Sequence, residues 1–497
     1  MILEQNLRFL SKRVKEILKD TKEASLEYKI NKEGIKIPFY NKVSIHSLYN
    51  PFVENKNYDF KENTLIISIG FGAGYHLVNL ISKYKEIIVV LFEFGIFKSI
   101  VSNIDLTTFF NENNLKIITL DEILDYYDFF HYESYQIIYP LSYERIFSSV
   151  LLENIRNIKA VLNNKIVDIN IQKKFGKIWH KNILKNIKYF DRFNNSPLTI
   201  DKPILITGAG YSLIENINLI KRLRNFIYLA ATDTSLKILD SYGITPDSVF
   251  TFDCQNWTLH HFLALKNYNF RLFMDFTVRI PSEKIENITL LFSNHPFKNF
   301  FLQQKNRSQI DSSSGNIGAS TIDFFYRYFK DIPIITCGID YGIYNYFVYA
   351  KGSSITINNN IKSNFFQTMD NFDTRILYNY NIKDRNGIWC TNSLLKSYSE
   401  FCKNLPYVTE IFTLSNSPFT NFTKIENFEI FLNNISIKEK TLYFSKIDID
   451  NLYNNFKNFL CKNRDALMPY FLAIKKIPDE ETIKNLIDYS IDFLKQK

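Results

Sequence analysis

Glycine is scarce in this sequence, and its placement constrains the fold more than any other feature does. Of 15 glycines among 497 residues, nine fall in four short turns that follow apolar, strand-like runs. The turns are Gly70–Gly74, Gly208–Gly210, Gly315–Gly318 and Gly338–Gly342. Glycine permits a positive φ angle and lets backbone N–H groups approach a ligand without an obstructing Cβ atom. Such turns after strands are typical of phosphate or nucleotide cradles.

Length and composition limit the class of protein. A chain of 497 residues is too long for one hydrophobic core, so we expect two or three domains. The apolar fraction of 46% and the aromatic fraction of 16% exclude a largely disordered protein. The net charge of +9 is spread along the chain without a dense Lys/Arg block. This charge permits an anionic small molecule or an acidic protein as partner and does not favour nucleic acid.

Cysteine spacing and hydropathy bear on the compartment. The chain has five cysteines with no CxxC spacing, which predicts reduced, buried thiols rather than a disulfide or zinc framework. They are Cys254, Cys337, Cys390, Cys402 and Cys461. No apolar run approaches the roughly 20 residues of a membrane span. The N-terminus is amphipathic and charged, unlike a signal peptide, so we expect a soluble, cytoplasmic protein.

The first third of the chain reads as an α/β unit. A helix and a hairpin over Glu27–Tyr40 precede a strand at Thr64–Ile69, the first glycine turn, and a helical stretch at Tyr75–Tyr84. A second strand at Ile87–Phe92 ends at Glu93, and residues 151–190 look helical. Alternating strands and helices predict a parallel sheet.

A second α/β unit follows a linker-like stretch at Asp191–Lys202. We expect strands at residues 203–207, 226–231, 248–252 and 332–337, and a helix at residues 319–328. The run Ser212–Glu215 fits a capping box at a helix start. The last 70 residues, from about 427, are mostly amphipathic helix. The expected architecture is α/β, with two Rossmann-like parallel-sheet domains at 1–190 and 191–426 and a helical region at 427–497.

Polar groups in the second unit gather where its strands end. Gly208, Gly210 and Ser212 lie at a helix start, where free N–H groups and the helix dipole favour an anion. Asp233 and Asp253 end the next two strands, and open α/β sheets bind ligands at that edge. Helix capping is an alternative for Asp233; it fits Asp253 less well, because no local helix is evident after it.

Two further groups extend this edge. Ser312–Gly318 offers hydroxyl and backbone donors before a helix, and Asp340-Tyr341 follows another strand. No Walker lysine follows any turn, so a P-loop is excluded. The pair His260-His261 is more often structural than metal-ligating, and we expect no metal site.

The first turn is a weaker candidate for a second nucleotide-like site. Gly70, Gly72 and Gly74, with Glu93 some twenty residues on, have the Rossmann spacing, in which the acid would reach ribose hydroxyls. The same turn is similar to the first motif of class I methyltransferases. It could also do no more than pack a helix against a strand.

The order of motifs resembles the motility-associated factor (Maf) flagellin glycosyltransferases. Those proteins share their central domain with archaeal 6-hydroxymethylpterin pyrophosphokinases and are distantly similar to bacterial sialyltransferases. His46–Glu54 looks like the family's HS-x-Y-x-P-x-x-E stretch, and Gly70–His76 like its G-x-G-x-GYH turn. Trp179–Asn186 looks like its W-x-x-N-x-x-x-N helix. Gly208–Leu213 is similar to its GxGPSL nucleotide loop. Later matches are Asp233-Thr234, Ile244–Asp247, Phe252-Asp253, the serine–glycine helix start and Gly338–Asp340.

The sequence also departs from the family pattern at three places. Tyr211 stands where the nucleotide loop usually has proline. Tyr349–Gly352 stands where members often have His-x-x-Gly, and Thr413–Thr420 replaces an Asn-Ala-Thr-x-Gly-Gly stretch.

The resemblance implies transfer of a CMP-activated nonulosonic acid, of pseudaminic or legionaminic type, to Ser or Thr of flagellin in support of bacterial motility. It implies that the nucleotide loop holds the phosphate and that the strand-end acids meet the ribose or cytosine. The serine–glycine helix start would meet the sugar carboxylate. Asp253 or Asp340 would be the base, and no cofactor is required. The donor-binding residues so implied are Gly208, Ala209, Gly210, Ser212, Asp233, Thr234, Ser314, Gly315, Thr321 and Tyr341.

Two other functions remain open on the sequence. A pyrophosphokinase of the same fold would use ATP and magnesium, held by converging carboxylates. A non-catalytic relative would bind flagellin without transferring a sugar. The C-terminal helices, with the N-terminal domain, would dock flagellin, or else they simply pack in the core.

Overall fold

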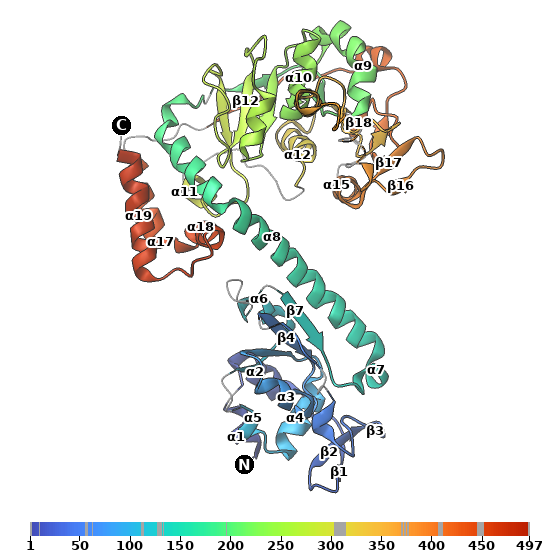
Figure 1. Cartoon of the computed structure of the whole chain (residues 1–497), viewed down its shortest axis with the longest axis vertical. Coiled ribbons are helices and arrows are strands. Elements are labelled where there is room, and N and C mark those ends of the chain that lie inside the picture. The colour runs from blue at the N-terminus through green and yellow to red at the C-terminus, as the bar shows by residue number, and fades with distance from the viewer. Residues whose placement is uncertain are drawn as a thin grey trace. The chain divides into compact units, whose positions relative to one another are not determined.

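The computed structural model describes residues 2–8, 10–54, 58–61, 63–110, 114–126, 132, 134–194, 196–302, 315–368, 371, 374, 377–405, 411–444 and 452–495. The chain divides into two compact units (Figure 1). Unit 1 comprises Met1–Lys174 with Ile474–Ile477, and unit 2 comprises Phe175–Ala473 with Pro478–Lys497. The three-part division expected from the sequence, with boundaries at residues 190 and 426, is a different partition and stays a prediction.

Unit 1 is built on a four-stranded parallel sheet with the order β6-β5-β4-β7. Its strands and those of the N-terminal hairpin are β1 (Glu27–Ile30), β2 (Lys36–Tyr40), β3 (Val43–Ser44), β4 (Thr64–Ile69), β5 (Ile87–Val90), β6 (Leu115–Ile118) and β7 (Ser134–Ile138). Its helices are α1 (Ile2–Leu7), α2 (Lys12–Asp20), η1 (Pro51–Val53), η2 (Tyr75–Leu77), α3 (Val78–Ile81), α4 (Phe94–Asn103), α5 (Thr107–Phe110), η3 (Leu120–Glu122), α6 (Ile123–Tyr126), α7 (Tyr143–Ile146) and the first part of α8 (Ser148–Lys188).

The first glycine turn lies where the strand order of unit 1 reverses. β4 has the bounds that the sequence predicts, and every residue in it is buried, as in a parallel sheet covered on both faces. The chain runs from β4 outward to β5 and β6, then returns to place β7 on the other side of β4. Ligands of open α/β sheets bind at such a reversal, beyond the carboxyl ends of the strands.

Unit 2 is built on an eight-stranded parallel sheet with the order β13-β12-β11-β10-β9-β14-β18-β19. Its strands, with those of its small antiparallel pairings, are β8 (Leu198–Ile200), β9 (Ile204–Thr207), β10 (Tyr228–Thr232), β11 (Ser248–Thr251), β12 (Arg271–Asp275), β13 (Ile288–Leu291), β14 (Ile334–Cys337), β15 (Ile343–Tyr344), β16 (Ile382–Lys383), β17 (Trp389–Thr391), β18 (Ile411–Thr413), β19 (Thr423–Lys424) and β20 (Lys440–Leu442). Its helices are the end of α8, η4 (Phe190–Arg192), α9 (Tyr211–Arg222), η5 (Arg224–Phe226), α10 (Asp233–Ser241), η6 (Asn256–His261), α11 (Lys298–Leu302), α12 (Ile317–Phe329), α13 (Ser354–Lys362), α15 (Ser393–Lys403), α16 (Phe428–Asn433), α17 (Leu452–Lys462), η8 (Arg464–Leu467), α18 (Met468–Ala473) and α19 (Glu480–Lys495).

The strand order of this sheet also reverses, between β9 and β14. β9 pairs with β10 on one side, with Ala231 opposite Thr207, and with β14 on the other, with Cys337 opposite Thr207. The chain therefore builds the sheet outward from β9 to β13 and then crosses back to add β14, β18 and β19. The predicted fold class, with two parallel-sheet α/β parts and helices near the C-terminus, is confirmed.

Two details of unit 2 correct the sequence-based reading. The stretch expected to be a linker contains β8, which pairs with β20 in a region expected to be mostly helical. Leu198 and Ile200 in β8 are buried, because their side chains pack into the hydrophobic core of unit 2. A linker composition therefore did not mean an unstructured segment.

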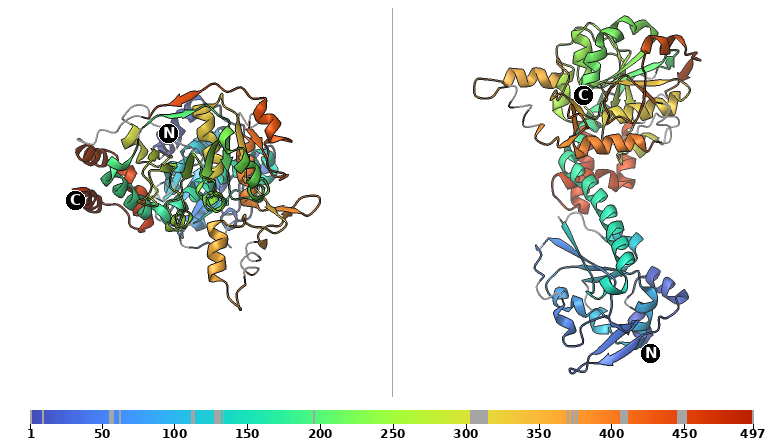
Figure 2. Two further views of the ribbon diagram at one scale, coloured as in Figure 1. Left: turned by 90° about the horizontal axis from the view of Figure 1, so that it is seen from above. Right: turned by 90° about the vertical axis from the view of Figure 1, so that its right-hand side faces the viewer.

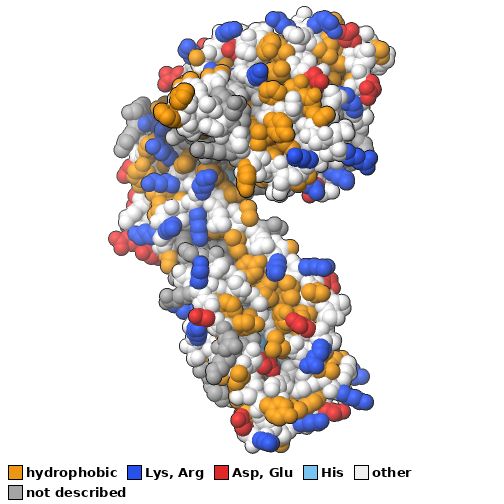
Figure 3. Space-filling view, turned by 45° about the vertical axis from the view of Figure 1, so that its right-hand side comes forward, with side chains coloured by type: hydrophobic (Ala, Val, Ile, Leu, Met, Phe, Trp, Pro, Cys, Tyr) orange, Lys and Arg blue, Asp and Glu red, His pale blue; other side chains and the backbone are white. Residues whose placement is uncertain are grey.

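On the face drawn in Figure 3, Lys and Arg side chains are scattered among acidic and apolar ones rather than gathered in one block. In both views of Figure 2, α13 and the turn after it project away from the sheet of unit 2. Phe365 and Phe366 in that turn are each 90% exposed.

Candidate functional site

Two of the four glycine turns meet at the strand reversal of unit 2. The Gly210 amide donates to the carbonyl of Gly338 at 2.8 Å. A Cβ atom on Gly208 would lie 2.4 Å from the Gly338 carbonyl oxygen, and one on Gly338, whose φ is +74°, would lie 2.2 Å from the Gly208 oxygen. Glycine is needed here because two backbones cross in contact. The structure thus brings together turns that are about 130 residues apart in the sequence.

Asp340 closes this junction by binding the start of α9. Its carboxylate accepts hydrogen bonds from the Ser212 amide at 2.9 Å and the Ser212 hydroxyl at 2.5 Å, and that hydroxyl in turn accepts the Gly338 amide at 2.7 Å. The capping box expected at Ser212–Glu215 is wrong, because α9 begins at Tyr211 and the Ser212 side chain bonds to the neighbouring loop instead. Burial raises the pKa of the Asp340 carboxyl, while the hydrogen bonds from Ser212 and Ser415 lower it.

Asp233 lies one strand further along the same edge. It is the first residue of α10, is 3% exposed, and accepts the Thr251 hydroxyl at 2.7 Å. Burial raises the pKa of this carboxyl to about 7; hydrogen bonds from Thr251 and Thr234 oppose the shift and the charge of Asp253 adds to it. A carboxyl that titrates near neutral pH is unusual and is a recognised mark of functional sites.

Asp253 follows β11 and is exposed at the rim. Its carboxylate accepts the Gln255 amide at 2.9 Å. The expectation that no helix starts nearby is wrong, since η6 begins at Asn256, although Gln255 and not Asp253 is its N-cap. Three strand spacings of about 4.8 Å separate β11 from β14, so Asp253 and Asp340 follow strands roughly 14 Å apart.

One buried acid of this edge was missed by the sequence reasoning. Asp275 ends β12 and is 2% exposed. It accepts the amides of Thr277 and Ser293 at 2.8 and 3.0 Å, and burial raises the pKa of its carboxyl. The signal was present, because Asp275 follows the apolar run Leu272–Met274 as Asp253 follows its own strand.

The predicted serine–glycine stretch Ser312–Gly318 is described only from Gly315 on. Ser314 lies outside the described residues. Gly315 precedes α12, whose N-cap is Asn316, and the Thr321 hydroxyl donates to the carbonyl of Ile317 within that helix. Tyr341 is buried and its hydroxyl lies 3.1 Å from the Cys402 sulfur. The roles predicted for these residues in binding a sugar stay predictions.

Two asparagines of α8 hold the loops beyond β11 and β12. The Asn182 side chain donates to the carbonyl of Cys254, beyond β11, at 3.5 Å and to that of Thr277, beyond β12, at 2.9 Å. The Asn186 side chain donates to the carbonyls of Phe276 and Val278 at 2.8 Å each. Both side chains are buried and lie one helical turn apart, as the W-x-x-N-x-x-x-N spacing requires. That motif therefore positions the strand-end loops.

The histidines and cysteines of unit 2 are mostly buried. Burial lowers the pKa of His261 and of His180 to about 4, and the Nδ1 atom of His261 bonds to the Ser354 hydroxyl. Four of the cysteines are buried as expected and all five are free, but Cys461 is exposed, which corrects that part of the prediction.

In unit 1, acidic and hydroxyl side chains bind the amides of the first glycine turn. The Phe71 amide donates to Glu93 at 2.7 Å and the Gly72 amide to the Tyr143 hydroxyl at 3.1 Å. That hydroxyl donates to Glu93 at 2.8 Å, and burial raises its pKa well above the ordinary value. The Glu93 carboxylate thus bonds to the backbone of the turn that was expected to bind a ligand. Its contact with a ribose stays a prediction.

A histidine completes the same network. The Ala73 amide donates to His46 Nε2 at 2.9 Å, and His46 Nδ1 lies 3.2 Å from Glu54. A Cβ atom on Gly72 would lie 2.6 Å from His46 Nε2, so glycine is required for this approach. The His46–Glu54 and Gly70–His76 motifs are therefore two parts of one buried network.

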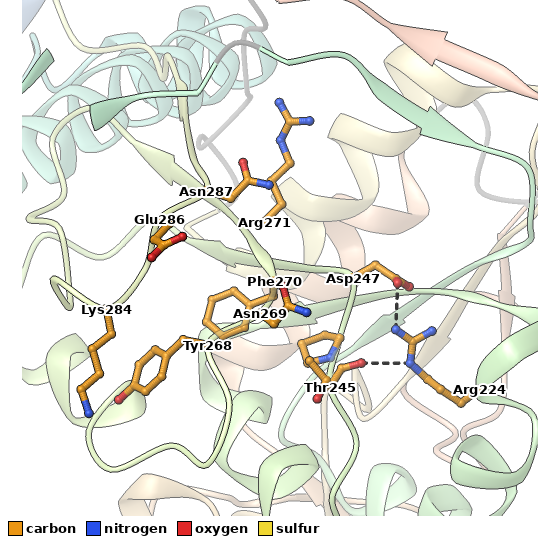
Figure 4. A pocket seen from close by; sticks show the side chains of 11 residues that line it. Arg224, Thr245, Asp247, Tyr268, Asn269, Phe270, Arg271, Lys284, Glu286 and Asn287 are labelled. Atoms are coloured by element: carbon orange, nitrogen blue, oxygen red, sulfur yellow. Dashed lines mark hydrogen bonds and ion pairs between the residues drawn. The ribbon is translucent and has the colours of Figure 1, made fainter. Parts of the chain in front are cut away.

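A cavity of about 660 Å³ lies at the amino ends of the strands in the unit 2 sheet, opposite the carboxyl ends that carry the glycine turns (Figure 4). Its lining includes Asp247, Phe270 and Asn287, which precede β11, β12 and β13. Arg224 in the same lining is paired with Asp247 at 2.8 Å. Strands of four or five residues place this cavity roughly 15 Å from the glycine turns, so it is separate from the candidate site.

The described residues show neither a cluster of metal ligands nor a membrane-spanning helix. No group of three or more His, Cys, Asp or Glu side chains there is arranged to hold a metal ion. None of the helices in the described part of the chain has the length and apolarity of a membrane span.

Both units have the fold of doubly wound α/β proteins, in which the strand order of a parallel sheet reverses. Residues 179–346, which run from the α8 asparagines through the glycine junction, match the family model of 6-hydroxymethylpterin diphosphokinase MptE-like proteins. The chain is similar in fold to the solved Maf glycosyltransferase from Magnetospirillum magneticum AMB-1. The TM-score is 0.53 and the identity 13%, with 99% of this chain and 93% of that chain covered.

Two curated relatives come from Treponema pallidum (strain Nichols), and both are uncharacterized proteins. One is 26% identical over 219 residues, covering 41% of this chain and 37% of the relative. The other is 28% identical over 130 residues, covering 26% of this chain and 58% of the relative. The match thus spans little more than a third of the first relative and somewhat over half of the second. The suspected resemblance to the Maf proteins, with an MptE-like central part, is confirmed.

Proposed function

We propose that this protein is a glycosyltransferase that moves a nonulosonic acid of pseudaminic or legionaminic type from its CMP conjugate to Ser or Thr hydroxyls of flagellin. The observation that carries the proposal is the junction of Gly208–Gly210 with Gly338–Asp340 at the strand reversal of unit 2. Parallel α/β sheets bind nucleotides at this position. The similarity in fold to a Maf glycosyltransferase over 99% of the chain supports the reaction class.

The donor would lie along the carboxyl edge of the sheet. The Gly210 and Ser212 amides at the start of α9 already donate to Gly338 and Asp340, so the Ala209 and Tyr211 amides would face the phosphate. Asp233 would meet the ribose or the base. As the bond between the phosphate oxygen and the anomeric carbon breaks, CMP leaves with the electron pair. Amides at a helix start stabilise the charge that develops on the phosphate.

The acceptor hydroxyl then forms the new bond to the anomeric carbon and gives up its proton. Asp253 is the better base of the two candidates, since its carboxylate is exposed at the rim, whereas Asp340 is buried and bonded to Ser212. Asp340 would instead position α9 and the nucleotide loop. A base must reach the proton that it takes, and geometry therefore favours Asp253.

A pyrophosphokinase using ATP and magnesium is the second candidate, because residues 179–346 match a family model described as a diphosphokinase. Thermal-shift measurements with CMP, and with ATP plus magnesium, separate the two functions. Stabilisation by CMP supports the transferase and stabilisation by ATP with magnesium supports the kinase. Response to neither ligand leaves a non-catalytic flagellin-binding protein.

The decisive test is mass spectrometry of flagellin from a strain lacking this protein and from one carrying the Asp253→Asn variant. The glycan mass should be absent in the deletion strain and strongly reduced in the variant. An unchanged glycan mass in the deletion strain would refute the transferase assignment.

A further inference from the structure

Three aromatic rings lie nearly parallel beside the nucleotide loop. Tyr211 directly follows Gly210, and its ring stacks on that of Tyr344 with centroids 4.2 Å apart and planes at 25°. The Phe347 ring lies 6.2 Å from Tyr211 at 23°. Trp389 packs against Tyr344 at 5.1 Å and 60°. Rings in such an arrangement offer flat apolar surface next to the loop expected to hold a phosphate.

The turn that carries two of these rings has an unusual backbone. Phe347 donates its amide to the Tyr344 carbonyl at 2.9 Å, so Asn345 and Tyr346 are the central residues of a tight turn. Their φ angles are +43° and +67°, in the left-handed region that glycine and asparagine favour. Tyrosine at the second position is strained, and burial does not compensate it, because Tyr346 is 62% exposed. Strain of this kind gathers at ligand clamps and active sites.

The aromatic turn is fastened to the nucleotide loop. Beyond Phe347 the chain returns to that loop, where the Ala350 amide donates to the Ala209 carbonyl at 3.0 Å. Lys351 in the same segment lies 5.5 Å from the Phe347 ring centroid. Lys351 therefore places a cation beside the Phe347 ring, which suits a phosphorylated ligand, while the Glu215 carboxylate acts on Tyr211.

We propose that Tyr211, Tyr344 and Phe347 form a stacking shelf for the planar base of the bound nucleotide, and that Tyr346, carried on the turn between Tyr344 and Phe347, adds its exposed ring to the contact. The inference rests on the proposed function, in which that base is cytosine. An uncharged base is favoured over the carboxylated sugar because the shelf presents flat aromatic surface, and stacking of a base on aromatic side chains stabilises a complex whatever the base. The shelf would hold the base while the glycine turn faces the phosphate.

Two variants separate a ligand role from packing. Tyr211→Leu removes the ring but keeps both the backbone amide and the helix start, since leucine is a strong helix former. Tyr346→Gly removes a ring and relieves the left-handed strain, so it should raise the thermal midpoint while it weakens ligand binding. Changes of opposite sign would not come from a tyrosine that only packs. Tyr443→Ala, an exposed tyrosine after β20, is the matched control.

The experiment is calorimetric titration of the full chain with CMP, cytidine, ATP, inorganic phosphate and N-acetylneuraminic acid. We expect wild-type protein to bind CMP and cytidine, and each shelf variant to weaken both by about tenfold. Binding of phosphate should be unchanged in the variants, and Tyr443→Ala should behave as wild type.

The outcomes distinguish the shelf from the proposed donor. Equal affinity of wild type and both variants for CMP and cytidine overturns the shelf and leaves the CMP donor in place. Binding of ATP but not CMP, with a loss in the variants, supports the shelf and overturns the donor. Weakened binding of the free sugar with unchanged cytidine binding overturns the base assignment, and absence of any nucleotide binding overturns both.

Discussion

The buried Asp233 predicts a specific dependence of stability on pH. Its pKa rises from 3.8 in an exposed carboxyl to about 7 in the folded chain, with burial as the largest cause. The folded state therefore binds the proton more tightly than the unfolded state. Below about pH 4 both states are protonated, so the Asp233 carboxyl does not lower the free energy of unfolding. As the pH rises from 4 through 7, the unfolded state ionises first, so folding loses stability.

The substitution Asp233→Asn removes this cost and keeps the shape of the side chain. A shift of about three pKa units is worth about 4 kcal/mol at pH 8, since each unit is 1.36 kcal/mol. Entry of water around the ionised carboxylate would make the gain smaller than this figure. The carboxamide oxygen still accepts the hydroxyl of Thr251, so that hydrogen bond is not lost.

The assay is the thermal midpoint of unfolding of wild type and Asp233→Asn between pH 4 and pH 8. The two midpoints should coincide near pH 4 and separate with rising pH, the variant being more stable by several degrees at pH 8. Asp201→Asn removes an exposed acid from the same unit and serves as control. Parallel curves for wild type and Asp233→Asn would show that the carboxyl titrates as an ordinary exposed one, and the reasoning from burial would then be refuted.

Three further substitutions test contacts at the two strand reversals and at the loop after β12. Ser212→Ala should destabilise unit 2 by about 1–3 kcal/mol and weaken CMP binding, because the Asp340 carboxylate and a buried amide lose their partner; denaturant unfolding and calorimetry check this. Asn186→Ala should cost about 1–3 kcal/mol, and hydrogen exchange should rise in the loop after β12. Gly70→Ala should cost about 2 kcal/mol or more in unit 1, because its φ is +78° and the new methyl group would meet Tyr143; unchanged proteolysis of unit 1 would contradict that geometry.

Much of the local structure could be predicted from the sequence. The strand at Thr64–Ile69 has the predicted bounds, and the strands expected at residues 203–207 and 332–337 are observed with slightly shorter ones. A strand followed by a glycine turn can be predicted from sequence, because the pattern involves only neighbouring residues. The hydrogen-bond partners of side chains could not be predicted in this way. Ser212 has a glutamate three residues on, as in a capping box, yet it bonds to Asp340, which no local rule could foresee.

The sequence by itself determined that strands end in glycines and acids, because these residue types set backbone freedom and charge wherever they occur. The tertiary structure alone decided that β14 lies against β9, and so placed Gly338 on Gly208 and Asp340 on α9. It also decided that Asp233 is buried and Asp253 exposed, although both acids follow similar strands. The physical reason is that strand order and burial depend on packing between residues far apart in the chain, and that packing is absent from any local pattern.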